Sequence, residues 1–224
     1  MDEDLIERVR REIYATFALA GRAPDPIEIA AAVHIDPAQV PEALARLAAA
    51  RHLALDANGG IVMAHPFTSV NLGFSVMGRT RLWWGGCAWD SFAIPNLVPD
   101  EPRVLVATAC PGCDSPLAWH VTNSGPPTGE EVAHFLVPMS QVWDDVVRTC
   151  SNQRLFCSEA CVDAWLAKHG RSQGYVMDLA TLWRLAHDWY TGRLQSPYER
   201  RDPEAAKEYF RSVGLQGSFW GIEP

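Results

Sequence analysis

The chain has 224 residues, of which 48% are hydrophobic and 21% are charged, and its formal net charge at pH 7 is −8. This composition is typical of a folded globular protein. The negative charge disfavours broad attraction to phosphate backbones or anionic lipid, so we expect neither a nucleic-acid nor a membrane partner. The acidic start lacks an apolar signal segment and no run approaches the length of a membrane span, so we expect a cytoplasmic protein.

The first 66 residues predict three helices followed by a β-hairpin. Apolar residues recur at helical spacing from Asp2 to about Ala20, and Asp25-Pro26 and Asp36-Pro37 each place a cap residue before a first-turn proline. A turn at 56–60 between two apolar segments predicts the hairpin. Three helices and a hairpin are typical of winged-helix DNA-binding regulators, but residues 1–65 carry six basic and ten acidic residues. We therefore interpret residues 1–66 as a structural, winged-helix-like module.

Residues 67–224 predict the second part of an α+β protein, a domain with a mixed, mainly antiparallel sheet and flanking helices. The segment from Phe67 to Trp84 is rich in β-forming residues and indicates two strands joined by a turn at 77–80. Further strands are expected near 104–107, 116–121 and 134–137. Helices are expected near 140–149, 162–170, 178–193 and 203–213.

A thiol and a carboxylate three residues apart, Cys87 and Asp90, form the centre of the candidate site. Gly85 and Gly86 let the backbone turn sharply, and the apolar run that follows predicts a short buried helix stopping near Pro95. In that helix Cys87 and Asp90 share a face, and the unpaired N–H groups of the first turn stabilise a thiolate. An aspartate beside a thiolate has a raised pKa and can deliver a proton. The alternative interpretation is a buried structural cysteine with a capping aspartate.

The other cysteines suggest a metal site. In a cytoplasmic protein, cysteines are more typical of metal binding or catalysis than of disulfides. Cys110-Pro-Gly-Cys113 and Cys157-Ser-Glu-Ala-Cys161 have the spacing of zinc knuckles, and the second pair is similar to treble-clef zinc modules. Together they predict a closed, structural zinc site. We interpret Cys150 as a buried helical residue, with a spare thiol for metal transfer as the alternative.

The remaining candidate site residues are histidines and tryptophans. We interpret the isolated histidines at 120, 134 and 187 as structural residues, because none has a partner at fixed spacing. Trp83, Trp84 and Trp89 surround the Cys87 segment, and we expect them to wall off a pocket that excludes water.

The segment Cys87-Ala88-Trp89-Asp90, with Phe92 and Pro95 after it and a Phe156-Cys157 pair about seventy residues later, resembles the organomercurial (alkylmercury) lyases. The resemblance implies an enzyme that cleaves carbon–mercury bonds by protonolysis. Cys87 and Cys157 would be the mercury-binding thiolates and Asp90 the proton donor. Cys110 falls where the family usually has a structural cysteine. The resemblance also implies a small organometallic or other small-molecule substrate, no required cofactor, and a thiol or metal-accepting protein as a partner.

The chain departs from the family pattern at Gly86, where an aromatic residue is usual, and after Cys157, where a histidine-bearing stretch is usual. Two hypotheses also compete for Cys157. If zinc holds it, the protein is a lyase-fold relative with a different activity, or none, centred on Cys87 and Asp90. A third hypothesis is a metal- or thiol-responsive winged-helix regulator.

Overall fold

The structure, a computed structural model, describes residues 2–223. Its α-helices are α1 (Glu3–Ala20), α2 (Pro26–Val33), α3 (Val40–Ala49), α4 (Ala88–Leu97), α5 (Val146–Ser151), α6 (Glu159–His169), α7 (Leu179–His187) and α8 (Pro203–Ser212). Short 3-10 helices are η1 (Pro37–Gln39), η2 (Met139–Gln141) and η3 (Ser218–Trp220). None of the helices in this part of the chain combines the length and apolar character needed to cross a membrane.

Two antiparallel sheets make up the β-structure. The larger sheet contains β1 (Ala54–Leu55), β2 (Ile61–Ala64), β3 (Phe67–Thr68), β4 (Ser75–Met77), β5 (Leu82–Gly85), β6 (Arg103–Ala109) and β7 (Pro116–Thr122), in the order β1-β2-β3-β5-β4-β6-β7. The smaller sheet contains β8 (Val132–Phe135), β9 (Gln153–Phe156) and β10 (Tyr175–Asp178), in the order β10-β8-β9. Helices and antiparallel strands together confirm the predicted α+β class.

The three predicted N-terminal helices and the hairpin are present, and α2 begins with a capping box at Asp25 followed by Pro26. The hairpin strand β2 also pairs with β3, in the register Met63–Thr68. The N-terminal module therefore shares its sheet with the rest of the protein, and the predicted boundary after residue 66 falls between two paired strands. Its winged-helix character and the division into two domains remain predictions.

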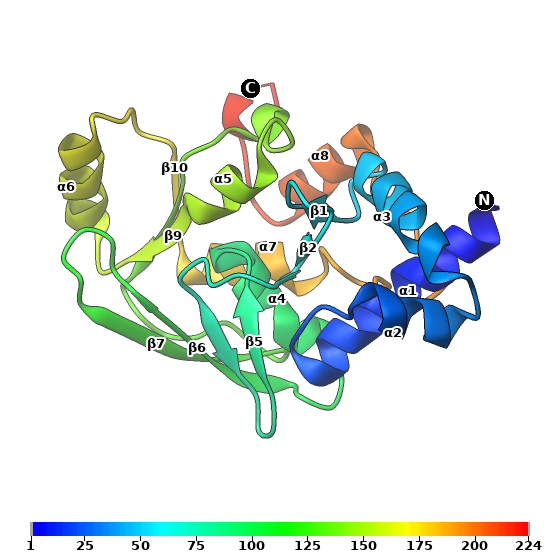
Figure 1. Ribbon diagram of the computed structural model, residues 1–224. Coiled ribbons are helices and arrows are strands. Elements are labelled where there is room, and N and C mark those ends of the chain that lie inside the picture. The colour runs from blue at the N-terminus through cyan, green and yellow to red at the C-terminus, as the bar shows by residue number, and fades with distance from the viewer. Residues whose placement is uncertain (1, 224) are drawn as a thin grey trace.

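Helix α4 lies at the centre of the molecule, with α1 to α3 on one side of it and α6 on the other (Figure 1). Nine of its ten residues are buried, so its surface is apolar all round rather than on one stripe. The helix packs against α7 and against strands of both sheets. The core therefore fixes the positions of the residues at the N-terminus of α4.

One predicted helix limit is confirmed within two residues, and two were wrong. Helix α4 ends at Leu97, two residues after Pro95. Helix α5 starts only at Val146, where the Asp145 side chain caps it. Helix α7 ends at His187 instead of near residue 193.

Helix α1 also holds the segment after α7 in place. Arg10 is buried and ion-paired with Glu7, and its guanidinium donates to the carbonyl oxygens of Arg193 and Gln195, each at 2.6 Å. Hydrogen bonds from a charged donor are among the stronger ones in proteins. They fix the backbone that carries Tyr190 and Arg193.

Candidate functional site

A cavity of about 490 Å³ opens at the N-terminal end of α4. The reactive side chains on its wall are Cys87, Asp90, Cys150, His65 and Tyr190. They come from the start of α4, from α5, from the end of β2 and from the segment after α7. Residues distant in sequence thus meet at one buried point.

Cys87 is the N-cap residue of α4, and its sulfur accepts a hydrogen bond from the Asp90 N–H at 3.4 Å. A serine, threonine or aspartate usually occupies this position and satisfies one of the four free N–H groups of a helix start. The predicted proximity of Cys87 and Asp90 follows from this cap. The side chains are 2% and 1% exposed, so the cap is inside the protein.

Gly86 explains why no aromatic residue precedes Cys87 in this chain. A Cβ atom added there would lie 2.3 Å from Asp90 Oδ2 and 2.6 Å from Met63 Cε. Both distances are far shorter than any van der Waals contact. The glycine therefore makes room for the carboxyl group of Asp90.

Cys150 supplies a second thiol beside Cys87. It is 4% exposed, it lines the same cavity as Cys87, and its Sγ is 3.5 Å from His65 Nε2. One ligand atom each from His65, Asp90 and Cys150 lies within 4.8 Å of the others. With Cys87, the cavity wall carries two thiols and one carboxyl group.

Burial is the main influence on the pKa values of Asp90, Cys87 and His65. It raises the pKa of Asp90 to about 7, against the lowering effects of hydrogen bonds from Tyr190 and Cys87 and of the Arg193 charge. Burial, Cys150 and the Asp90 carboxyl raise the pKa of Cys87 well above its usual value. The pKa of Cys150 is also raised: its hydrogen bond with Cys87 acts downward, and burial and Asp90 outweigh it. Burial lowers the pKa of His65 to about 3, so its ring is neutral.

Near neutral pH the resting site therefore holds protonated thiols, a neutral imidazole and a carboxyl group that is half protonated. A buried carboxylic acid that titrates near pH 7 is suited to proton delivery. The predicted rise in the pKa of Asp90 is found, and its main cause is desolvation rather than a neighbouring thiolate.

Tyr190 orients Asp90, and sequence reasoning missed it. Its hydroxyl donates a hydrogen bond to Asp90 Oδ1. Burial raises the pKa of Tyr190 well above its usual value, so the phenol keeps its proton. Asp90 Oδ2 is buried without a hydrogen-bond partner. Because the phenol already donates to Oδ1, Oδ2 is the oxygen on which we place the acidic proton of Asp90.

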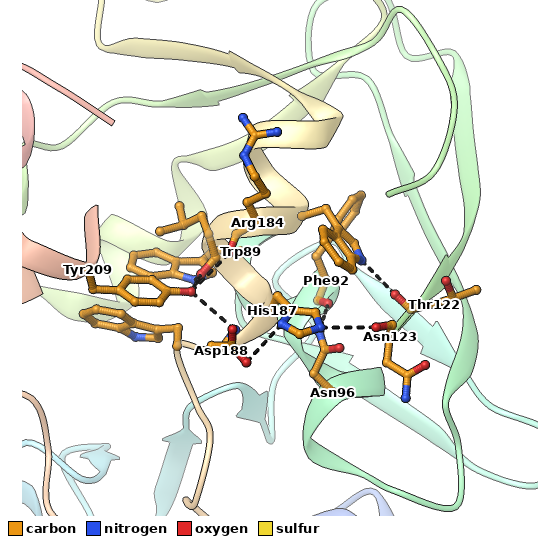
Figure 2. Close-up of polar contacts among 12 residues, drawn as sticks. Trp89, Phe92, Asn96, Thr122, Asn123, Arg184, His187, Asp188 and Tyr209 are labelled. Atoms are coloured by element: carbon orange, nitrogen blue, oxygen red, sulfur yellow. Dashed lines mark hydrogen bonds and ion pairs between the residues drawn. The ribbon is translucent and has the colours of Figure 1, made fainter. Parts of the chain in front are cut away.

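The end of α7 positions Tyr190, and Figure 2 shows how that end is fixed. The Tyr209 hydroxyl accepts from the Asp188 N–H at 3.3 Å and lies 3.1 and 2.9 Å from the carbonyl oxygens of Arg184 and Leu185. The Trp89 indole also donates to the Leu185 carbonyl, at 3.2 Å. These contacts satisfy carbonyls that a helix end leaves free. Helix α7 consequently stops at a defined residue, and the chain turns toward Asp90.

Five of the six histidines and tryptophans singled out in the sequence are absent from the cavity wall. His187 binds the Asn123 carbonyl and Asp188, as Figure 2 shows, and His134 accepts from the Gly174 N–H at 3.1 Å. Trp83 is buried and donates to the Phe17 carbonyl, at 2.9 Å. Of the three tryptophans expected to line the pocket, Trp89 does so, and the other cavity tryptophans are at 143, 189 and 220.

The structure does not bring Cys157 to Cys87 and Asp90. Cys157 is absent from the cavity wall, and its N–H donates to Cys110 Sγ at 3.4 Å. The sulfurs of the predicted zinc cysteines, Cys110, Cys113, Cys157 and Cys161, all lie within 4.8 Å of one another. Cys157 directly follows β9, and its N–H contacts Cys110 at the end of β6. The fold therefore places Cys157 in this cluster. The geometry offers no support for Cys157 as a catalytic thiol, and it places Cys150 where that thiol was expected.

Cationic side chains also line the cavity. They are Arg51, Arg193, Arg200, Arg201 and Lys207, whereas the acidic lining residues are Asp90 and Asp202. The guanidinium of Arg200 lies 4.8 Å and that of Arg51 5.7 Å from the Trp143 ring centre. The ion pairs found among residues 2–223 include none of these four arginines. The cavity is therefore locally positive in a protein of net charge −8.

Comparison with known proteins adds to this geometry. The model of the MerB alkylmercury lyase family matches residues 67–191, a span that contains Cys87, Asp90, Cys150 and Tyr190. The crystal structure of the mercury-bound form of MerB2 is similar in fold, with a TM-score of 0.63 and 17% sequence identity. That likeness covers 87% of this chain and 93% of the other. No curated protein matches the chain.

The family match spans more than half of the chain, and the chain belongs to the alkylmercury lyase family, whose enzymes cleave carbon–mercury bonds. The predicted family and enzyme class are confirmed. As a family, these lyases need no cofactor.

Proposed function

We propose that this enzyme cleaves organomercurials by protonolysis, with Cys87 and Cys150 as the mercury-binding thiols and Asp90 as the proton donor. The observation that carries the proposal is the meeting of two buried thiols with a carboxyl group whose pKa is about 7. Mercury is a soft metal and prefers thiolate ligands. Cys157, the thiol expected from the family resemblance, is replaced in this proposal by Cys150.

The first step is a thiol exchange. The organomercurial arrives as the complex of an organic group, mercury and an external thiolate. The sulfur of Cys87 displaces that thiolate, which leaves as a thiol with the Cys87 proton. We assign the first exchange to Cys87 because its sulfur accepts the Asp90 N–H at the start of α4, and this contact offsets part of the burial that keeps the thiol protonated.

The second step breaks the carbon–mercury bond. Cys150 binds the mercury, its sulfur pushes electron density onto the metal, and Asp90 transfers its proton to the departing carbon. The carbon leaves as a hydrocarbon, and the proton of Cys150 replaces the one that Asp90 gave up. One organic group is released, one Hg(II) stays on two thiolates, and every proton is accounted for. A thiol from solution or a metal-accepting protein then removes the mercury.

Neighbouring residues position the carboxyl group of Asp90 and the thiol of Cys150. Tyr190 fixes Oδ1 of Asp90, and Gly86 gives the carboxyl group its space. The neutral ring of His65 lies against Cys150 and is available as a hydrogen-bond partner for its S–H group. Trp89 and the other aromatic residues of the cavity exclude water, which favours direct proton transfer to carbon.

The arginines suggest a substrate class. A low-dielectric cavity with an excess of positive charge concentrates anions. Arg193 is held by Tyr198 and the His65 carbonyl, whereas among residues 2–223 Arg200 has a ring contact with Trp143 and one long hydrogen bond, to the Ala50 carbonyl at 3.4 Å. Arg200 is thus free to bind a ligand. We assign to the enzyme organomercurials that carry a carboxylate, on the organic group or on the thiol ligand.

The free cysteines also fit a reducing compartment, so the proposal includes a cytoplasmic location. The hypothesis of a DNA-binding regulator loses its support, because the N-terminal helices belong to an enzyme of this family. The hypothesis of a zinc-bearing relative no longer competes with lyase activity, because the two sites share no cysteine.

The direct test is release of the hydrocarbon. Purified enzyme with excess thiol is incubated with phenylmercury in heavy water, and benzene is measured by gas chromatography with mass detection. The proposal expects one monodeuterated benzene for each phenylmercury consumed. A folded enzyme with titratable Cys87 that releases no benzene would refute the proposal.

A further inference from the structure

The four cysteines outside the cavity form a second site that the lyase reaction does not use. Cys110 follows β6, Cys113 lies in the turn before β7, and Cys157 and Cys161 lie at the junction of β9 with α6. All six cysteines of the chain are free, so none of these is in a disulfide. The β6–β7 turn of the larger sheet and the start of α6, which follows the smaller sheet's strand β9, therefore bring four thiols close together.

The spacing of the sulfurs matches a tetrahedral metal site. All four Sγ atoms lie within 4.8 Å of one another, and those of Cys113 and Cys157 are 3.6 Å apart. A zinc ion bound to four thiolates at about 2.3 Å requires sulfurs about 3.8 Å apart. The separation is much longer than a disulfide bond of about 2.05 Å. A small contraction around a central ion is all that the site needs.

The backbone around the sulfurs is built for close approach. A Cβ atom on Gly112 would lie 2.3 Å from the Cys161 carbonyl oxygen, so the first knuckle reaches the second only because residue 112 is glycine. The Cys157 N–H donates to Cys110 Sγ, as backbone N–H groups do to metal-bound thiolates. Ser158 caps α6 and accepts from the Cys161 N–H at 3.4 Å. The two knuckles are thus held rigidly against each other.

We propose that Cys110, Cys113, Cys157 and Cys161 bind one zinc ion in a closed, structural site. Four thiolates with tetrahedral spacing select zinc over harder cations such as calcium or magnesium. With all four positions filled by protein, no position is left for a substrate. The site's role is to fasten the β6–β7 turn to the β9–α6 junction.

This location ties the zinc site to the cavity mechanically. Cys150 lies on α5, the cavity residue Gln153 begins β9, and Cys157 follows the last residue of that strand. The zinc ion therefore anchors one end of a short segment that carries one wall of the cavity. Its loss loosens the segment with Cys150 while leaving the thiol itself in the chain.

The test is metal content with matched cysteine variants. The wild-type protein, purified without added metal, is expected to contain one zinc per chain by mass spectrometry. Cys113→Ser and Cys161→Ser are expected to retain less than a tenth of that zinc, whereas Cys87→Ser and Cys150→Ser retain all of it. The proposal is overturned if Cys87→Ser and Cys150→Ser lose zinc while Cys113→Ser and Cys161→Ser retain it.

A spectroscopic measurement on the wild-type protein tests the same proposal if the zinc-site variants fail to fold. Cobalt(II) exchanged into the wild-type protein is expected to give the absorption of a tetrahedral tetrathiolate complex, unchanged by Cys150→Ser. A bound metal other than zinc in the purified protein, or cobalt without thiolate absorption, overturns the zinc assignment. Zinc without benzene release refutes only the proposed function, and benzene release without zinc refutes only this inference.

Discussion

Replacing Asp90 with asparagine is expected to abolish catalysis while changing stability in a strongly pH-dependent way. The carboxyl group has a pKa of about 7 in the folded protein and of 3.8 when unfolded. Because the folded pKa is raised, the wild-type protein keeps all of this group's stability below pH 3.8. It loses about 1.4 kcal/mol for each pH unit up to 7 and nothing further above pH 7.

The expected difference follows from these two values. Between pH 5 and pH 8 the free energy of unfolding of the wild-type protein falls, through this group, by about 3 kcal/mol. Asparagine does not titrate, so Asp90→Asn gains about that amount relative to the wild type over the same interval. Any hydrogen bond that the asparagine amide fails to make costs the same at both pH values and cancels.

Urea unfolding of both proteins at pH 5 and pH 8 measures this change. Asp163→Asn, at an exposed position on α6, is the matched control and should differ from the wild type equally at the two pH values. Benzene release by Asp90→Asn should fall more than a hundredfold, in line with the usual contribution of a proton donor. A stability difference that is the same at pH 5 and pH 8 would refute the buried, high-pKa carboxyl group on which the mechanism depends.

Three further substitutions test the groups around Asp90. Tyr190→Phe removes a hydrogen bond that lowers the Asp90 pKa, so the loss of kcat at high pH should move upward by about half to one pH unit, and a pH profile of unchanged position would contradict this role. Gly86→Ala should reduce kcat at least tenfold and cost about 1–3 kcal/mol in urea unfolding, whereas Gly125→Ala, where an added Cβ meets nothing within 4 Å, should change neither. Arg200→Gln should raise KM for 4-carboxyphenylmercury about tenfold and leave KM for phenylmercury nearly unchanged, and equal effects on both substrates would remove the carboxylate assignment.

Much of the fold and part of the site could be predicted from local sequence patterns. Cys87 and Asp90 were predicted to act together because their three-residue separation puts them on the same helical turn. The zinc cysteines were found because each pair is a short knuckle, although the meeting of the two pairs depends on the fold. The cap residue and proline at Asp25-Pro26 located the start of α2, and those at Asp36-Pro37 located the start of η1, which leads into α3.

The rest of the site depends on contacts between distant segments. Tyr190 bonds to a residue 100 positions away, and His65 meets Cys150 across 85 positions, without any spacing pattern to show it. Cys150 looked like an ordinary helical cysteine, and the Phe156-Cys157 pair matched the family resemblance better. Only tertiary packing distinguishes the thiol beside Cys87 from the thiol in the zinc-type cluster.

Single-turnover cleavage of phenylmercury distinguishes Cys150 from Cys157 as the second mercury-binding thiol. Cys150→Ser and Cys157→Ser are compared at equal concentrations of folded protein, with circular dichroism to confirm folding. Cys150→Ser is expected to release benzene at least a hundredfold more slowly than wild type, whereas folded Cys157→Ser, which keeps Cys150 and loses only the zinc-site fastening, is expected to be slowed less than tenfold. Wild-type rates in Cys150→Ser, together with loss of cleavage in folded Cys157→Ser, would contradict the account.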